Sequence, residues 1–316
     1  MTDPLLVADV GGTRVRFAVC APGGAPLDTK VLAVADFPGI AEAAQSYLGG
    51  LRERPKRGAI AVAGPVAGDS FTMTNHTWSF STEAVRRALG LESLVLVNDF
   101  EANALAIPHL TPVDVVQWGG GTPVQRAPYG ILGPGTGLGV AALVWGGARW
   151  VAVPGEGGHV DFPPDDDDEI LILRELAARF GHVSLERILS GPGLVHLFEV
   201  FAKKLGLPLV RQTIPADVAA AALRGDAAAV AAARAFSGIL GAAAGNLALT
   251  LGARGGVFIA GGVVANLGAA FDRALFRDRF EAKGRFAGYL AQIPTFHIVN
   301  PFPALLGLAH AALDGR

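Results

Sequence analysis

The order of strand-like and helix-like segments repeats once along the chain, and this repetition restricts the possible folds most strongly. Three strand-like segments lie between residues 5 and 35, and alternating helix and strand patterns continue to residue 108. A second group of three strands begins at about residue 129 and is followed by a mostly helical stretch and two further strands, the first of them expected over 255–264. A last helical pattern covers 303–315. Two such units predict two α/β domains with a cleft between them.

Three glycine-rich turns interrupt this order. DVGGTR (9–14) and GPGTGLG (133–139) each lie between the first and second strands of a unit, and AGGVV (260–264) comes later. Glycines leave backbone N–H groups open to an anion, and the hydroxyls of Thr13 and Thr136 can bond phosphate oxygens. A glycine-rich hairpin explains any one of these turns. The matched pair is harder to explain that way and favours phosphate binding.

Two common nucleotide motifs are absent from the sequence. There is no Gly-Lys-Ser/Thr, so a P-loop of the Walker type is excluded, and GPGTGLG lacks the G-x-G-x-x-G spacing of dinucleotide folds. Asp9 ends the first strand and could orient a magnesium ion through water. Such an ion would neutralise charge during phosphoryl transfer.

A near-continuous apolar run, residues 94–97, predicts a buried parallel strand that ends in Asn98 and Asp99. Both residue types are good helix N-caps, because their side-chain oxygens accept the free N–H groups of the first turn. A carboxylate at the carboxyl end of a strand in an open α/β sheet also lies where ligands bind. This stretch alone leaves both roles open.

The bulk composition narrows the class of protein. The chain has 316 residues and is 51% hydrophobic, so it can form a large core. A formal net charge of −2 without a basic cluster argues against nucleic acid as the main partner. The single cysteine, Cys20, excludes an intramolecular disulfide and a multi-cysteine zinc site. The opening MTDPLLVADV has no basic or cleavable apolar segment, which predicts a cytoplasmic protein.

Two further segments need an interpretation. Residues 235–253 carry no charge and are long enough to raise the question of a membrane span. Their glycines and Asn246 favour a buried helix packed closely on a sheet instead, and we expect no membrane partner. The acidic run 165–169 is interpreted as a solvated helix start, with a metal site as the weaker alternative.

A series of longer motifs runs in order from residue 9 to about 286: DVGGTR, AVAGPV, MTNHTWSFS, VNDFEANALAIP, GPGTGLGVA, PGEGGHVDF, HVSLERILSGPGL, FIAGGVV and FEAKGRF. The series resembles the bacterial glucokinases of the hexokinase–actin-like ATPase superfamily. The resemblance implies a two-lobed actin-like ATPase (ribonuclease H-like) α/β fold with a central cleft. Its units would be duplicated in the order strand-strand-strand-helix-strand-helix-strand-helix. Residues 1–109 plus 301–316 would form the smaller lobe, and 110–300 the larger lobe with a helical insertion.

The resemblance also implies a sugar site, made of Asn98, Asp99, Glu156, His159 and Glu186. Asp99 would act as general base, accepting the proton of the sugar's 6-hydroxyl as that oxygen attacks the γ-phosphorus of ATP. Asn98 would bond nearby hydroxyls. Trp78 and Phe80 could wall the cleft or belong to a hairpin core, and they are not assigned to the site.

The residue patterns alone would not give the larger-lobe sugar residues this role. Glu156 and His159 lie three apart in a glycine-bracketed loop, where a lone loop carboxylate and a structural histidine are the simpler interpretation. A zinc site of the kind found in the related repressor/open-reading-frame/kinase family is disfavoured, because no cysteine follows His159. Glu186 lies in the first turn of an expected helix, where the helix dipole would stabilise its negative charge.

For the nucleotide, the resemblance places phosphates against 8–13 and 133–139 and adenosine near Gly261 and Gly262. The residues expected to bind ATP and Mg²⁺ are Asp9, Gly11, Gly12, Thr13, Gly135, Thr136, Gly137, Gly261 and Gly262. No direct protein ligand to the metal is expected, although Asp9 could contact it through water.

The leading hypothesis is an ATP-dependent glucokinase that acts at the first step of glycolysis, with glucose and ATP as its small-molecule partners. A kinase for another hexose, or with another phosphoryl donor, is the alternative. A sugar-sensing regulator is disfavoured, since Asp99 is intact and the first strand begins at about residue 5. A filament ATPase would not need Asn98-Asp99 together with Glu156 and His159. The resemblance also suggests a homodimer formed through the larger lobe.

Overall fold

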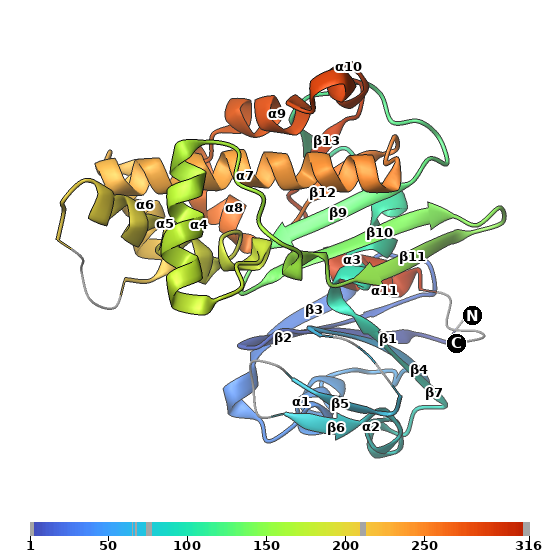
Figure 1. Cartoon of the computed structure of the whole chain (residues 1–316). Coiled ribbons are helices and arrows are strands. Elements are labelled where there is room, and N and C mark those ends of the chain that lie inside the picture. Colours follow the sequence, from blue (N-terminus) through green and yellow to red (C-terminus); the bar gives the residue numbers. More distant parts are fainter. Residues whose placement is uncertain (1–2, 65, 67, 74–77, 209–212, 312–316) are drawn as a thin grey trace. The chain divides into compact units, whose positions relative to one another are not determined.

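The computed structural model describes residues 3–64, 66, 68–73, 78–208 and 213–311 (Figure 1). The chain divides into two compact units. Unit 1 consists of Met1–Thr111 together with Asn300–Arg316, and unit 2 of Pro112–Val299. Unit 1 is therefore built from both ends of the chain, and unit 2 is continuous.

Unit 1 contains a five-stranded sheet with the order β3-β2-β1-β4-β7. β1 (Leu5–Val10), β2 (Arg14–Cys20) and β3 (Leu27–Ala33) are antiparallel neighbours. β4 (Arg57–Val62) runs parallel to β1, and β7 (Ser93–Asn98) runs parallel to β4. The carboxyl ends of β1, β4 and β7 thus lie at one edge of the sheet.

Helices cover both faces of this sheet. Side chains of β1 alternate between two cores, since successive residues of a strand point to opposite faces. Leu6, Ala8 and Val10 pack with residues of α1 (Ile40–Leu48) and α2 (Thr82–Leu89). Leu5 and Val7 pack with residues of α3 (Asp99–Ala106) and α11 (Pro303–Ala309). The last described helix thereby completes the unit that the first strand begins.

A short ribbon follows β4. β5 (Ser70–Thr72) and β6 (Ser79–Ser81) pair antiparallel, as expected for a hairpin, and Thr74–Thr77 lie outside the described residues. Trp78 is only 3% exposed, and its Nε1 donates to Phe37 O at 3.2 Å. Of the two roles considered for Trp78, the structure supports the core. Two single-turn 3₁₀ helices complete the unit: η1 (Val34–Asp36) and η2 (Ile107–His109).

Unit 2 contains a six-stranded sheet with the order β11-β10-β9-β12-β13-β8. Its strands are β8 (Val115–Gln117), β9 (Tyr129–Pro134), β10 (Leu138–Trp145), β11 (Trp150–Gly155), β12 (Gly256–Ile259) and β13 (Thr295–Ile298). β9, β10 and β11 are antiparallel neighbours, whereas β9, β12 and β13 run parallel. The first five strands of this order match the pattern of unit 1, and β8 adds an antiparallel edge that the sequence did not predict.

The helices of unit 2 are more numerous than those of unit 1. Between β11 and β12 the chain forms α4 (Asp167–Phe180), α5 (Gly191–Lys204), α6 (Pro215–Leu223) and α7 (Ala227–Leu251). α8 (Gly262–Leu267), α9 (Arg273–Glu281) and α10 (Ala287–Ala291) lie between β12 and β13. The α/β class is confirmed, with mixed sheets in both units. The predicted duplication of the complete strand and helix order stays a prediction.

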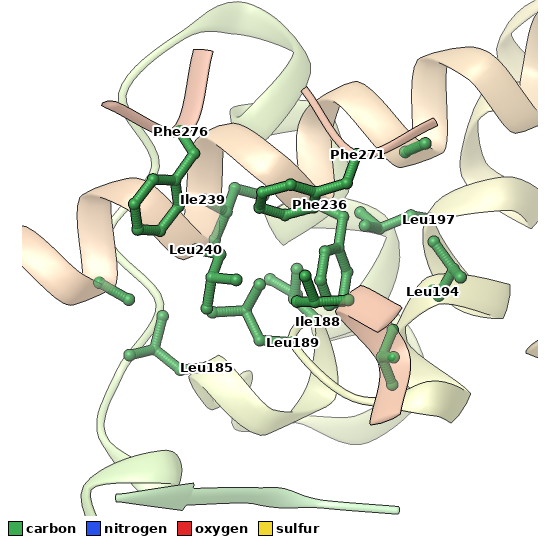
Figure 2. Close-up of a cluster of buried hydrophobic side chains, with 14 of the residues drawn as sticks. Leu185, Ile188, Leu189, Leu194, Leu197, Phe236, Ile239, Leu240, Phe271 and Phe276 are labelled. Atoms are coloured by element: carbon green, nitrogen blue, oxygen red, sulfur yellow. The ribbon is translucent and has the colours of Figure 1, made fainter. Parts of the chain in front are cut away.

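The apolar segment considered as a membrane span is part of α7. This helix is long and apolar enough to cross a membrane by length and composition, but 67% of its most apolar window is buried inside the protein. Phe236, Ile239 and Leu240 lie in the main core of unit 2 (Figure 2). The expected buried helix is therefore observed.

Candidate active site

In unit 1, β7 ends at Asn98 and α3 begins at Asp99. Asn98 Oδ1 accepts hydrogen bonds from the backbone N–H groups of Phe100, at 2.8 Å, and Glu101, at 3.1 Å. Its Nδ2 donates to Gly64 O at 3.1 Å, which fixes the amide orientation. Asn98 is thus the helix cap that the sequence allowed.

Asp99 is the first residue of α3 and is half-buried. Its Oδ1 accepts from the N–H of Phe100 at 2.9 Å. A carboxylate in the first turn is favoured by the positive end of the helix dipole. Asn98 already accepts from two N–H groups of this turn, so the cap does not depend on Asp99. The carboxylate stands at the carboxyl edge of the sheet, the usual ligand-binding edge of open α/β sheets.

Asp9 lies at the same edge of unit 1, opposite Arg16 in the β1–β2 ladder. Arg16 Nη1 and Asp9 Oδ2 are 3.0 Å apart, and the Asp9 side chain is 19% exposed. Burial raises the pKa of Asp9 above its ordinary value, and the charge and hydrogen bond of Arg16 only partly offset this. The next turn is closed by Gly11 N donating to Arg14 O at 3.0 Å, with Thr13 exposed beside it.

In unit 2, the turn of GPGTGLG joins β9 to β10, just as Gly11–Thr13 joins β1 to β2. Gly135 N donates to Gly137 O at 2.8 Å, and Gly191 N, at the start of α5, donates to Gly135 O at 2.8 Å. The two predicted phosphate turns therefore occupy corresponding places in their sheets, as expected from the sequence.

The third glycine turn lies directly beside the second. Ala260 N donates to Leu132 O at 2.9 Å, and a Cβ on Gly261 would overlap with Pro134 O. Gly261 has φ +85°, a conformation that side chains disfavour. The expected strand over 255–264 is wrong in its second half, because β12 ends at Ile259 and α8 begins at Gly262. Two glycine turns thus meet at one edge of the unit 2 sheet.

The sugar residues predicted for the larger lobe lie in two short turns of unit 2. Glu156 Oε2 and His159 Nε2 are 4.0 Å apart, and both side chains are more than half exposed. The turn η3 (Gly157–His159) is closed by His159 N donating to Glu156 O at 3.0 Å. Both polar side chains therefore face outward together rather than into the core.

Glu186 lies in the second of these turns, η4 (Leu185–Arg187). Leu185 N donates to Val160 O at 2.9 Å, which joins the two turns. Glu186 Oε2 accepts from Leu138 N at 2.9 Å, at the end of the glycine turn. Leu185 packs into the main core with Ile188 and Leu189 (Figure 2). The structure thus links the predicted sugar residues of unit 2 to a predicted phosphate turn.

Sequence reasoning missed the residues that hold these groups in place, namely Arg16, Gly64, Leu138, Ser190 and Gly191. Gly64 lies in the AVAGPV motif, and Ser190 and Gly191 lie in the HVSLERILSGPGL motif. The motifs therefore contained these residues but did not indicate what they do. Leu138 lies within the GPGTGLG motif but had no role assigned to it, and Arg16 carried no signal beyond its place shortly after a glycine turn. Such partners are defined by strand pairing and long-range packing.

The acidic run forms the start of α4, as interpreted from the sequence. Asp166 caps the helix by accepting from Glu169 N at 2.8 Å. Glu169 differs from the expected solvated face, since it is buried and Arg279 Nη2 donates to its Oε1 at 2.8 Å. Within the part of the chain that the structure describes, no group of three or more His, Cys, Asp or Glu side chains is arranged so that it could hold a metal ion.

A sequence model of the glucokinase family matches residues 6–315. The chain belongs to the glucokinase family. A curated relative named glucokinase, from Nitrobacter hamburgensis, is 46% identical over 99% of this chain and 98% of its own length. The first curated relatives are longer. The bifunctional protein glk of Burkholderia orbicola is 48% identical over 97% of this chain, and the chain spans about half, 48%, of its length.

Solved structures agree with this assignment. A glucokinase from an Antarctic psychrotroph has a TM-score of 0.87 and 33% identity, with 98% of both chains covered. A glucokinase from Streptomyces griseus, of the repressor/open-reading-frame/kinase (ROK) family, was solved in complex with glucose and AMPPNP. It has a TM-score of 0.66 at 21% identity, over 99% of this chain and 100% of its own, and shows the shared fold. The predicted family is confirmed.

Proposed function

We propose that this member of the glucokinase family transfers the γ-phosphoryl group of ATP to the 6-hydroxyl of D-glucose, giving glucose 6-phosphate and ADP. The observation that carries the proposal is Asp99, which follows β7 at the carboxyl edge of the sheet in a chain whose family match covers residues 6–315. Curated relatives named glucokinase support the choice of glucose.

Asp99 is proposed as the general base. It accepts the proton of the 6-hydroxyl while that oxygen forms a bond to the γ-phosphorus and the bond to the β-γ bridging oxygen breaks. A carboxylate suits this task, because phosphoryl transfer depends mainly on positioning and on charge stabilisation. The Asn98 cap keeps the first turn of α3 in place and so positions the carboxylate.

The remaining sugar hydroxyls are assigned to Asn98, Glu156, His159 and Glu186. Carboxylates accept hydrogen bonds only, and an imidazole can donate or accept, so the set can recognise several hydroxyls at once. A site that hydrogen-bonds a hydroxyl strongly rejects analogues that lack it. Asn98 belongs to unit 1, and Glu156, His159 and Glu186 belong to unit 2.

For the nucleotide we propose ATP, with its phosphates against the turns Gly11–Thr13 and Gly135–Gly137 and its adenosine near Gly261 and Gly262. The Streptomyces griseus enzyme of this fold, crystallised with AMPPNP, supports a nucleotide as donor. Asp9 offers a fixed carboxylate of the kind that holds hydrated Mg²⁺. When bound, that ion would supply positive charge to the phosphates.

The two units are proposed to be duplicated copies of one actin-like ATPase domain, which the common order of their first five strands supports. The protein is proposed to act in the cytoplasm at the first step of glycolysis. It is proposed to be a homodimer, which rests on the family resemblance and can be checked by sedimentation equilibrium.

The test is the initial rate of ADP formation with Mg-ATP in the presence of glucose, mannose, fructose, N-acetylglucosamine or no sugar, with L-glucose as control. We expect strong preference for D-glucose and little turnover without sugar. Preference for another hexose would change the proposed substrate but not the proposed role of Asp99 as the base. Sugar-independent hydrolysis, or no turnover with any sugar, would overturn the proposed function.

A further inference from the structure

Glu186 has two neighbours that the proposed function treats separately. As a proposed sugar ligand, its carboxylate accepts from a glucose hydroxyl. In the structure the same carboxylate already accepts, through Oε2, from Leu138 N at 2.9 Å, directly after the proposed phosphate turn Gly135–Gly137. An ionised carboxylate has about four acceptor positions, so one oxygen can hold Leu138 while the other takes a hydroxyl.

The segment that carries Glu186 also holds the other side of this turn. Glu186 O accepts from Ser190 Oγ at 2.8 Å, and the same Oγ caps α5 by accepting from Gly193 N at 3.0 Å. At the start of α5, Gly191 N donates to Gly135 O at 2.8 Å. Residues 186–193 therefore form a hydrogen-bonded bracket around the turn.

The backbone of the bracket is held in place by buried neighbours, whereas the side chain of Glu186 can change its conformation. Leu185, Ile188 and Leu189 are buried in the main core of unit 2 (Figure 2). The Glu186 side chain is half-buried, and it approaches the turn so closely that a Cβ on Gly137 would overlap with its Oε2. The turn itself contains Gly135 and Gly137, whose backbones lose much entropy when they are fixed.

We propose that Glu186 is a positioning residue that couples sugar binding to nucleotide binding through Leu138 and the Gly135–Gly137 turn. A sugar hydroxyl that fixes the Glu186 side chain also fixes the turn in its phosphate-binding shape, so part of the ordering cost is already met when the nucleotide arrives. The coupling is reciprocal, because both ligands act on one shared equilibrium. This inference rests on the proposed function.

The test compares two glycine-to-alanine variants of unit 2. In Gly137→Ala the new methyl group displaces the flexible end of Glu186, whereas in Gly288→Ala, in α10 and outside the proposed site, it meets no atom within 4 Å. The dissociation constant of Mg-AMPPNP is measured by calorimetry on the full chain, without sugar and with saturating D-glucose. The ratio of the two constants is the coupling factor. The glucose constants, measured with and without Mg-AMPPNP, must give the same factor.

We expect glucose to tighten nucleotide binding about 5-fold or more in the natural chain and in Gly288→Ala, within the usual range of coupling. In Gly137→Ala the factor falls to about 1 even if both ligands still bind. Glu186→Asp, whose shorter side chain withdraws from Leu138 N, lowers the factor as well and provides a second variant with a different steric effect.

The outcomes separate this inference from the proposed function. An unchanged factor in Gly137→Ala and Glu186→Asp, or no coupling in the natural chain when both ligands bind, would overturn the coupling role of Glu186. A purely structural role would weaken both ligands without changing the factor, and this result also counts against the inference. Failure of the natural chain to bind either ligand would instead overturn the proposed function.

Discussion

At the scale of single residues, Asn98 and Asp99 are neighbours with different surroundings. Asn98 uses both ends of its amide, accepting from the start of α3 and donating to Gly64. Because Asn98 caps α3, the helix does not depend on the side chain of the next residue, Asp99, for its cap. Losing such a cap typically costs about 1 kcal/mol of stability, so a change at Asn98 mixes structural and catalytic effects. Asp99 is the cleaner position for a test.

Replacing Asp99 by Asn should lower kcat by about 100-fold or more, the usual contribution of general base catalysis. The amide is isosteric, so thermal stability and the dissociation constant of Mg-AMPPNP should change little. The measurement is ADP formation at saturating glucose, with Glu53→Gln, an exposed carboxylate of the same unit, as the matched control. A variant that keeps most of its turnover would exclude Asp99 as the base.

Replacing Asp9 by Asn should leave thermal stability equal or higher while weakening the use of Mg-ATP. Because burial raises the pKa of Asp9, its neutral form favours folding. That contribution is complete below the unfolded-state pKa of about 3.9 and is lost as pH rises through the folded-state pKa. The variant should therefore melt at the same or a higher temperature than the natural chain at pH 7.5, with the difference shrinking toward pH 4.5.

The same variant should raise the KM for Mg-ATP about 10-fold or more, as expected when a group that orients a metal ion is lost. Thermal melts at the two pH values and rates at varied Mg-ATP check both parts. A lower melting temperature at pH 7.5 would show that the Arg16 pair outweighs the cost of burial, contrary to the pKa direction.

The sequence pointed to candidates for the site more readily than to the residues that support them. Asn98, Asp99, Glu156, His159 and Glu186 stand in motifs that follow strands or glycine turns, and such places can be identified from local patterns. That Arg16 holds Asp9, or that Glu186 binds Leu138 N, depends on pairing between segments distant in sequence. Nothing in the local pattern of residues encodes those distances.

At the scale of elements, α11 packs closely against α3, the helix that begins with the proposed base. A Cβ on Gly307 of α11 would overlap with Ala102 O of α3. Ala102 and Leu305 are fully buried in the same core, so neither helix can move away without opening it. The position of Asp99 at the start of α3 therefore depends on a small residue near the C-terminal end of the chain.

Gly307→Ala should destabilise unit 1 by about 1–3 kcal/mol, the usual cost of overpacking. It should also reduce kcat, because α3 carries Asp99. Gly288→Ala in α10 is the matched control, since its new methyl group meets no atom within 4 Å and should be neutral or stabilising by up to about 1 kcal/mol. Denaturant unfolding and rates at 25 °C measure both effects. Equal stability of the two variants would contradict the packing argument.

Strongly periodic elements were predictable and short ones were not. The apolar runs of β1, β4 and β7 identified strands because both faces of the sheet are covered. β1 and β4 are buried as expected, whereas in the described part of β7 only Val97 is buried and Leu94–Leu96 are partly exposed. β8 has three residues, two of them exposed, and gave no such pattern. The run Val263-Val264 looked like a continuation of β12, but Gly261 breaks the strand and starts α8.

At the scale of the whole molecule, the assembly of unit 1 from two distant segments of the chain affects the order in which its parts are made. A ribosome adds about 5–20 residues per second, so β1 emerges many seconds before α11, which shares its core. Unit 2 is complete once Val299 has been synthesised, whereas α3 still lacks the helix that packs against it. The proposed base thus acquires its final support only when α11 has been synthesised, so a partly made chain that lacks α11 holds Asp99 without the helix that packs against α3.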